Sequence, residues 1–166
     1  MQLYTSAKTS RKQVPALHKA LLKAKVWQPG DVNADIGGGK YDLITKALCR
    51  AGVTNLVYDP FNRSESHNQT VLRLIQERAT TATVANVLNV IAEPENRAEV
   101  IELASQASRV FFTVYEGNKS GVGCATRDGW QENRKLGTYL PEIRRFLKAE
   151  AQSLGRLRLI VAQSLA

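Results

Sequence analysis

Short apolar runs alternate with amphipathic segments along most of this 166-residue chain. Leu17, Leu21 and Leu22 recur at helical spacing with lysines opposite, whereas residues 32–36 form a short apolar run directly before three glycines. Such patterns predict helices over residues 13–25, 41–51, about 68–78, 94–107 and 139–154, and strands over residues 32–36, 55–58, 83–91, 109–115 and 156–162. Strands that alternate with helices predict an α/β fold: a doubly wound, mostly parallel sheet with helices on both faces.

The length and composition are those of one globular domain, with 43% hydrophobic and 23% charged residues. We divide it into an N-terminal helical segment (1–30), a core of alternating elements (31–116) and a C-terminal part with a loop, a basic helix and a last strand (117–166). The loop over 117–137 is longer than most connections in a compact domain. We therefore expect it to act as a lid or a substrate loop.

Positive charge is concentrated at the two ends of the chain. The sequence has 23 Lys and Arg against 15 Asp and Glu, a net charge of +8, and residues 1–25 contain no acid. If the two ends meet in space, they would form one positive face suited to a nucleic acid. The alternative is a basic surface that serves solubility alone.

Cysteine usage and hydropathy predict the compartment. Cys49 and Cys124 form neither a disulfide framework nor a metal-binding spacing, which is typical of free thiols in a reducing compartment. Residues 1–12 lack the apolar core of a signal peptide, and no segment approaches the roughly 18 apolar residues of a membrane span. We expect a cytoplasmic protein with no membrane contact and no metal site.

A glycine turn follows the first predicted strand. Gly37 and Gly39 let the backbone turn sharply and let a ligand approach, and the helix start after them offers free N–H groups. Asp59, about twenty residues later, ends the second strand, where an acid can accept hydrogen bonds from ribose hydroxyls. Ligands of open parallel sheets bind at the carboxyl ends of the strands, so these residues predict a nucleoside-containing ligand.

The residues around the turn narrow the choice of ligand. The dinucleotide pattern G-x-G-x-x-G lacks its third glycine, and no phosphate-binding P-loop pattern is present. Asp35 would repel a pyrophosphate but suits an ammonium or a sulfonium, and S-adenosylmethionine carries both. The alternative is that Asp35 caps the next helix and residues 37–39 form an ordinary loop.

Three segments together resemble the class I S-adenosylmethionine-dependent methyltransferases: Asp35-Ile36-Gly37-Gly38-Gly39, Asp59-Pro60, and the run 86–91 before Glu93-Pro94-Glu95-Asn96-Arg97. Over about residues 8–116 the chain is most similar to a small bacterial and phage subgroup that resembles the methyltransferase-like proteins associated with DNA phosphorothioation. Tyr41 departs from the family by replacing the third glycine, and the segment between Asp59 and Thr83 leaves little room for a separate strand. The resemblance implies a compact, Rossmann-like fold and S-adenosylmethionine as the cofactor.

The resemblance also assigns roles to particular residues. It implies cofactor contacts at Asp35, Gly37, Gly38, Gly39, Asp59, Pro60 and Asn86. Of these, Asp35 and the glycines would face the methionine part and Asp59 the ribose. Asn86 and Asn89 would lie where the sheet opens toward the transferring methyl group, or would instead bond the strand's own backbone. The run 86–89 lacks the prolines of enzymes that methylate the exocyclic amines of bases, so that activity is not supported.

The acceptor side is predicted from residues after the fourth strand. Glu116, at the end of that strand, is the acid best placed to act as a general base, unless it is only an exposed strand-end carboxylate. In the long loop, Trp130, Gln131, Asn133 and Arg134 combine a stacking surface with hydrogen-bonding groups, which suits a base or another polar substrate. The alternative is a loop held in place by one buried tryptophan.

Two further functions stay open beside methyl transfer to an unidentified acceptor, such as a nucleic acid. One is a non-catalytic subunit of a modification system that binds S-adenosylmethionine, and the other is a nucleic-acid-binding module that uses the basic ends. The fold alone does not decide among them.

Overall fold

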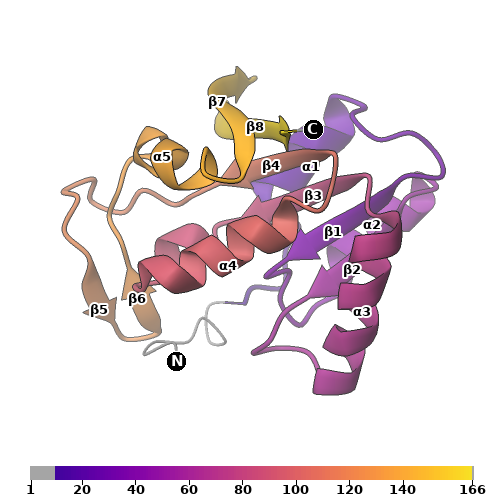
Figure 1. Ribbon diagram of the computed structural model, residues 1–166, viewed down its shortest axis with the longest axis horizontal. Helices are drawn as coiled ribbons and strands as arrows, with labels where there is room; N and C mark the ends of the chain where they lie inside the picture. Colours follow the sequence, from indigo (N-terminus) through magenta and orange to yellow (C-terminus); the bar gives the residue numbers. More distant parts are fainter. Residues whose placement is uncertain (1–9, 166) are drawn as a thin grey trace.

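A six-stranded sheet forms the centre of the computed structural model, which describes residues 10–165 (Figure 1). Its order is β2-β1-β3-β4-β8-β7. The strands are β1 (Val32–Ile36), β2 (Thr54–Tyr58), β3 (Thr81–Ala85), β4 (Arg109–Thr113), β7 (Leu147–Leu154) and β8 (Leu157–Ser164). The pairs among β1 to β4 are parallel, and β8 is antiparallel to both its neighbours. The prediction of a mostly parallel sheet is confirmed.

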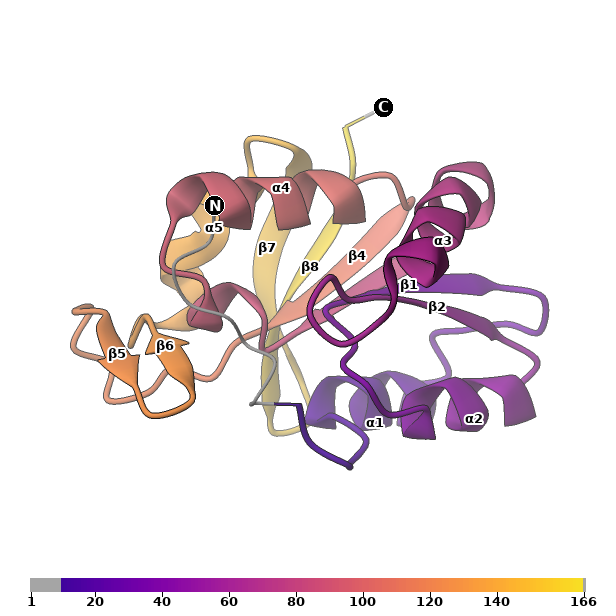
Figure 2. The same ribbon diagram turned by 90° about the horizontal axis from the view of Figure 1, so that it is seen from below.

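Helices cover both faces of this sheet (Figure 2). The helices are α1 (Ala16–Lys23) and α2 (Leu43–Arg50) on one face, and α3 (Glu65–Arg78), α4 (Pro94–Ala104) and the short α5 (Leu140–Ile143) on the other. Alternation along β1 separates two apolar cores: Ala34 and Ile36 pack toward α3 and α4, whereas Asn33 and Asp35 face α1. Among the described residues, no helix is long and apolar enough to cross a membrane.

Helix α1 packs against β4 and β8, so this early helix lies beside the last strand (Figure 1). The exposed lysines of α1, Lys19 and Lys23, therefore share one part of the molecule with the last strand. Lys8 and the rest of residues 1–9, which the sequence analysis included in the basic N-terminal stretch, lie outside the described residues.

Two elements begin earlier than the apolar pattern indicates. Helix α3 begins at Glu65 rather than near residue 68, because the Ser64 hydroxyl accepts a hydrogen bond from the His67 amide (3.2 Å) and caps the helix. Strand β3 spans Thr81–Ala85 rather than 83–91. The strand stops before Asn86, whose φ of 57° lies in the left-handed region that asparagine tolerates. A short 3-10 helix, η2 (Leu88–Val90), follows.

The prediction of a basic helix over residues 139–154 is wrong. A 3-10 turn, η3 (Leu136–Tyr139), leads into α5, and the chain then forms β7. Residues 147–152 alternate between inward and exposed positions, and all eight residues of β7 pair with β8. Pairing with β8 therefore outweighs the helix propensity of its alanine, glutamate and lysine residues.

The long loop over 117–137 contains a small hairpin, β5 (Cys124–Thr126) and β6 (Gly129–Gln131). A buried ion-pair cluster holds it against the rest of the fold. The buried Arg97 of α4 contacts Glu132 (2.9 Å) and Glu142 (2.8 Å) and donates to the Ile91 carbonyl (2.8 Å). Arg134 completes the cluster through Glu142 (2.9 Å). The segment expected to be a lid is thus anchored at its C-terminal end.

A buried polar layer lies within the sheet, on the face toward α1. The Asp35 carboxylate, 2% exposed, lies 3.3 Å from Nε2 of His18 and accepts hydrogen bonds from the Thr83 hydroxyl (3.1 Å) and the Asn55 amide (3.4 Å). Burial acts to raise the pKa of Asp35, but His18 and the three hydrogen bonds outweigh it, so that pKa lies below its ordinary value of 3.8. The ionised carboxylate therefore joins β1, β2, β3 and α1.

We predict that Asp35→Asn lowers the free energy of unfolding at pH 7 by about 1.5–3 kcal/mol, because hydrogen bonds to a charged group are lost. Since the folded-state pKa is depressed, this stabilisation is complete above 3.8 and is lost as the pH falls through the lower folded value. Urea unfolding from pH 7 to pH 2 measures both effects. An Asp35→Asn protein with the wild-type stability and the same acid dependence would contradict the role given to this carboxylate.

We predict that Arg97→Met destabilises the protein by about 3–5 kcal/mol, because it leaves two carboxylates without their buried partner. Arg73→Met, which changes an exposed arginine of α3, is the matched control and should cost less than about 0.5 kcal/mol. Urea unfolding at pH 7 compares the two variants. Equal effects would show that the cluster does not anchor the hairpin.

Candidate functional site

A cavity of about 800 Å³ opens at the carboxyl ends of β1, β2 and β3. The turn at 37–39, the loop after β2, the start of α1, helix α4 and the β5–β6 hairpin line it. Chain order reverses at this place, since β1 is followed by β2 on one side and has β3 on the other. Such switch points are where open parallel sheets bind ligands, and the volume falls within the roughly 300–1,000 Å³ of small-molecule sites.

The glycine turn forms one wall of the cavity. Neighbouring side chains pack so closely against the turn that only glycine fits at its positions. Gly37 and Gly39 adopt φ angles of 72° and 80°. A Cβ atom on Gly37 would lie 2.6 Å from Val87, and one on Gly38 would lie 2.7 Å from the Asp35 carboxylate. The backbone of the turn is thereby fixed at the cavity, as the sequence predicted for a close approach to a ligand.

The predicted ribose residue, Asp59, joins the two loops on this side of the cavity. Its buried carboxylate accepts hydrogen bonds from the amides of Gly39 (2.9 Å), Phe61 (3.0 Å) and Asn62 (3.1 Å), and from the Asn62 side chain (3.1 Å). Pro60 lines the cavity beside it. These four donors fill the usual capacity of a carboxylate, so a further donor from a ligand requires that one of them, such as the Asn62 side chain, be displaced.

The two asparagines predicted near the methyl group separate. Asn86 is exposed and lines the cavity, and its amide donates to the Thr113 carbonyl (2.9 Å), which places it beside the end of β4. The Asn89 side chain is 2% exposed and does not line the cavity; its backbone carbonyl accepts a hydrogen bond from the Glu132 amide (2.8 Å). Of the two, Asn86 lines the cavity and Asn89 does not.

Glu116, predicted as a general base, is not brought to the cavity. One carboxylate oxygen accepts a hydrogen bond from the Leu136 amide (2.7 Å), and the other lies 3.9 Å from the Lys119 ammonium. The carboxylate therefore joins the two ends of the 117–137 segment.

The four predicted acceptor residues divide into two pairs. Trp130 and Gln131, on β6, line the cavity. Asn133 is buried away from it with φ 56° and donates to the Val122 carbonyl (3.0 Å), while Arg134 contacts Glu142 and lies 4.2 Å over the Tyr139 ring. The first pair remains a candidate for substrate contact, and the second holds the loop.

Several cavity residues were missed by sequence reasoning: Arg11, Tyr58, Glu99, Tyr115 and Asp128. Burial, together with the carboxylates of Glu99 and Asp59, raises the pKa of the Tyr58 phenol, so the phenol stays protonated and can donate a hydrogen bond. These residues come from five separate segments and share no local motif. Tyr58, Tyr115 and Asp128 lie at or near strand ends, which could have indicated them, whereas nothing in the sequence indicated Glu99, within α4, or Arg11.

The cavity is acidic although the protein is basic. Its lining includes the carboxylates of Asp35, Asp59, Glu99 and Asp128 but, among the described residues, only the Arg11 guanidinium and no lysine. A cavity of this sign attracts a cation and disfavours a phosphate.

Two other kinds of site find little support. Within residues 10–165, no group of three or more His, Cys, Asp or Glu residues could hold a metal ion.

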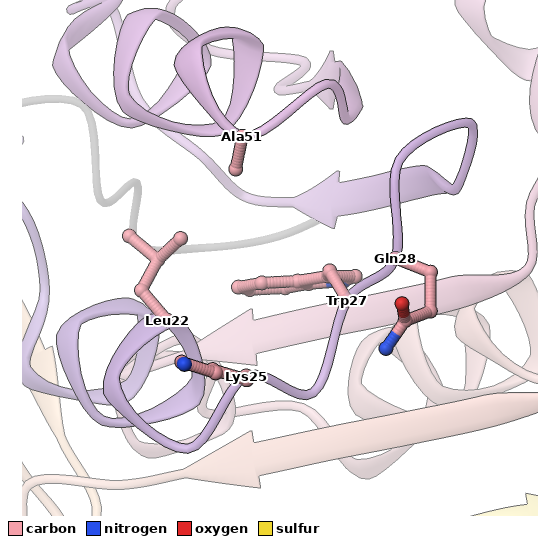
Figure 3. A pocket seen from close by; sticks show the side chains of 5 residues that line it. All are labelled: Leu22, Lys25, Trp27, Gln28 and Ala51. Atoms are coloured by element: carbon pink, nitrogen blue, oxygen red, sulfur yellow. The ribbon is translucent and has the colours of Figure 1, made fainter.

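A second, smaller hollow of about 200 Å³ lies between α1 and the end of α2 (Figure 3). Leu22, Lys25, Trp27, Gln28 and Ala51 line it and offer neither a carboxylate nor a thiol, and Trp27 is held in place by its hydrogen bond to Thr81 (2.8 Å).

Comparisons with known proteins find the fold but no sequence family. No protein-family model and no curated protein matches the sequence. Among solved structures, a Burkholderia thailandensis 1,6-didemethyltoxoflavin-N1-methyltransferase, with bound 1,6-didemethyltoxoflavin and S-adenosylhomocysteine, is similar with a TM-score of 0.65 and 14% identity. The likeness covers 91% of this chain and 78% of that one.

Two more solved structures are similar over most of the chain. A TehB-like SAM-dependent methyltransferase from Corynebacterium glutamicum gives a TM-score of 0.51 at 18% identity, covering 89% of this chain and 87% of that one. A Rhodobacter sphaeroides protein described as a putative Zn-dependent alcohol dehydrogenase gives 0.59 at 14% identity, covering 92% of both chains. Identities this low establish the fold alone, and that fold is the Rossmann-like one of class I methyltransferases.

Proposed function

We propose that this protein is an S-adenosylmethionine-dependent methyltransferase. The observation that carries the proposal is the acidic cavity at the switch point of the sheet, with the glycine turn on one wall and Asp59 at the end of β2. The S-adenosylhomocysteine bound to the structurally similar Burkholderia enzyme supports this choice of cofactor.

The residues of the cavity fit this cofactor in charge and in shape. The turn at 37–39 leaves room for the methionine part beside Asp35, whose negative charge favours the ammonium and the sulfonium. Asp59 is placed to accept the ribose hydroxyls, and Arg11 to pair with the carboxylate of the methionine part. His18 also lines the cavity, and its Nδ1 is buried without a hydrogen-bond partner among the described residues.

When bound, S-adenosylmethionine would supply a methyl group on a positively charged sulfur, open to displacement by an acceptor lone pair. The chain's own contribution is alignment of the two reactants. Asn86 and Trp130 line the cavity on the side away from Asp59, where they can orient an acceptor. The Tyr58 phenol, next to Asp59 at the end of β2, can donate a hydrogen bond to a ligand.

A second candidate is a protein that binds the cofactor without transferring its methyl group. The observation that favours it is the position of Glu116, whose carboxylate bonds the Leu136 amide rather than facing the cavity. Asp35 and Asp59 likewise form hydrogen bonds within the fold, so none of these three carboxylates is free to take a proton from the acceptor.

Three expectations from the sequence stay predictions: membership of the subgroup similar to phosphorothioation-associated proteins, a cytoplasmic location and a phage or bacterial source.

We predict that the full-length protein binds S-adenosylhomocysteine in a calorimetric titration and that Asp59→Asn weakens binding about tenfold or more, because the ribose loses a charged acceptor. The control is Glu77→Gln, which changes an exposed acid of α3 far from the cavity lining and should leave the affinity unchanged. Thermal melting of each variant verifies that it folds. Equal affinity in Asp59→Asn and the wild type would contradict the assigned ribose contact.

We predict that the protein moves labelled methyl from S-adenosylmethionine into an acceptor when it is incubated with separated nucleic-acid, protein and small-molecule fractions of a bacterial extract. Asp59→Asn at the same concentration should reduce the incorporated label in proportion to its loss of affinity. Tight binding of the cofactor without label in any fraction would favour the second candidate.

A further inference from the structure

The half of the cavity away from Asp59 has an aromatic wall. Tyr115 lies shortly after the end of β4; it lines the cavity and is 65% exposed. Trp130, on β6 of the hairpin, also lines the cavity. Large exposed aromatic side chains at the mouth of a cavity are typical of a binding surface.

The tryptophan of this wall is held in a fixed position before any ligand arrives. Its indole nitrogen donates to the Glu132 carboxylate (3.2 Å), and Glu132 is itself held by the buried Arg97 (2.9 Å). Gly123 packs against the ring so closely that a Cβ atom there would collide with it. A preorganised ring loses little conformational entropy when it stacks on a ligand.

The charge of the cavity disfavours one class of acceptor. Glu99 of α4, whose carboxylate also acts on the nearby Tyr58, and Asp128 of the hairpin turn line the cavity, while Gln131, Asn96 and Thr126 supply uncharged polar groups. Arg127 pairs with Asp128 (3.2 Å) but is itself 91% exposed at the hairpin tip and does not line the cavity. Of the residues that the structure describes, a phosphate or a carboxylate entering the cavity would meet these two carboxylates and, as a lining cation, Arg11 alone, the group assigned to the cofactor.

Resting on the proposed function, we propose that the methyl acceptor is a small planar aromatic molecule, neutral or cationic, bound against the wall formed by Tyr115 and Trp130. A nucleic acid is disfavoured at this site because its phosphates would accompany the base to the cavity. The exposed lysines of α1 do not line the cavity and cannot compensate there.

The test uses two indole probes of matched shape and opposite charge, tryptamine and indole-3-propionate, with a twelve-nucleotide single-stranded DNA as a third ligand. Each is titrated calorimetrically into full-length protein saturated with S-adenosylhomocysteine. We expect tryptamine to bind about tenfold or more tightly than indole-3-propionate, a difference of about 1.4 kcal/mol. Tighter binding of the acid or of the DNA, or no binding of either indole at millimolar concentration, overturns the inference.

Variants identify the residues responsible. Trp130→Leu and, separately, Tyr115→Ala should each weaken tryptamine binding about fivefold, because stacking is lost. Tyr115 is mostly exposed, so its variant folds even where Trp130→Leu loosens the hairpin. Combined Glu99→Gln and Asp128→Asn should bring the two indoles to similar affinities, whereas Glu77→Gln leaves their ratio unchanged. Unaltered tryptamine binding in both aromatic variants contradicts the wall.

The same titrations separate this inference from the proposed function. If S-adenosylhomocysteine binds and the indoles show no charge preference, the acceptor inference fails and the methyltransferase proposal stands. If S-adenosylhomocysteine does not bind, the methyltransferase proposal fails, and the acceptor inference falls with it.

Discussion

The buried carboxylate of Asp35 is the constraint on which the geometry of the site depends. It lies directly beneath Gly38, where a Cβ atom would come within 2.7 Å of it, and it is bonded from α1, β2 and β3 through His18, Asn55 and Thr83. An ionised carboxylate is costly to bury unless such partners surround it. The partners therefore fix three strands and one helix relative to the glycine turn, which is then rigid where the cofactor is proposed to bind.

A second set of charges positions the opposite side of the cavity. Arg97, Glu132 and Glu142 hold the β5–β6 hairpin against α4, so that Trp130 is presented to the cavity. In this second set the two arginines, Arg97 and Arg134, balance the two glutamates. The carboxylates that line the cavity outnumber its described cations, which gives the cavity a sign opposite to that of the protein as a whole.

The elements of the first half of the fold were predicted well, because short apolar runs that end at turn residues mark the strands over residues 32–59 clearly. It failed at 139–154, where the residues favour a helix and only pairing with β8 selects a strand. For the site, motif and position indicated Gly37, Asp59, Asn86 and Trp130, all of which line the cavity. Asn89, Glu116, Asn133 and Arg134 were expected at a ligand but lie off the cavity, since their direction depends on loop packing. Tyr58, Glu99 and Tyr115 come to line one cavity through the order of β2 and β4 in the sheet and the packing of α4, which no local sequence pattern indicates.

A crystal structure of the full-length protein grown with S-adenosylhomocysteine tests the central claim most directly. The account predicts the ligand's ribose on Asp59, with the Asn62 side chain displaced, its methionine part along residues 37–39, and its sulfur facing the half of the cavity that holds Asn86 and Trp130. A ligand bound elsewhere, or a cavity without ligand at saturating concentration, would contradict it.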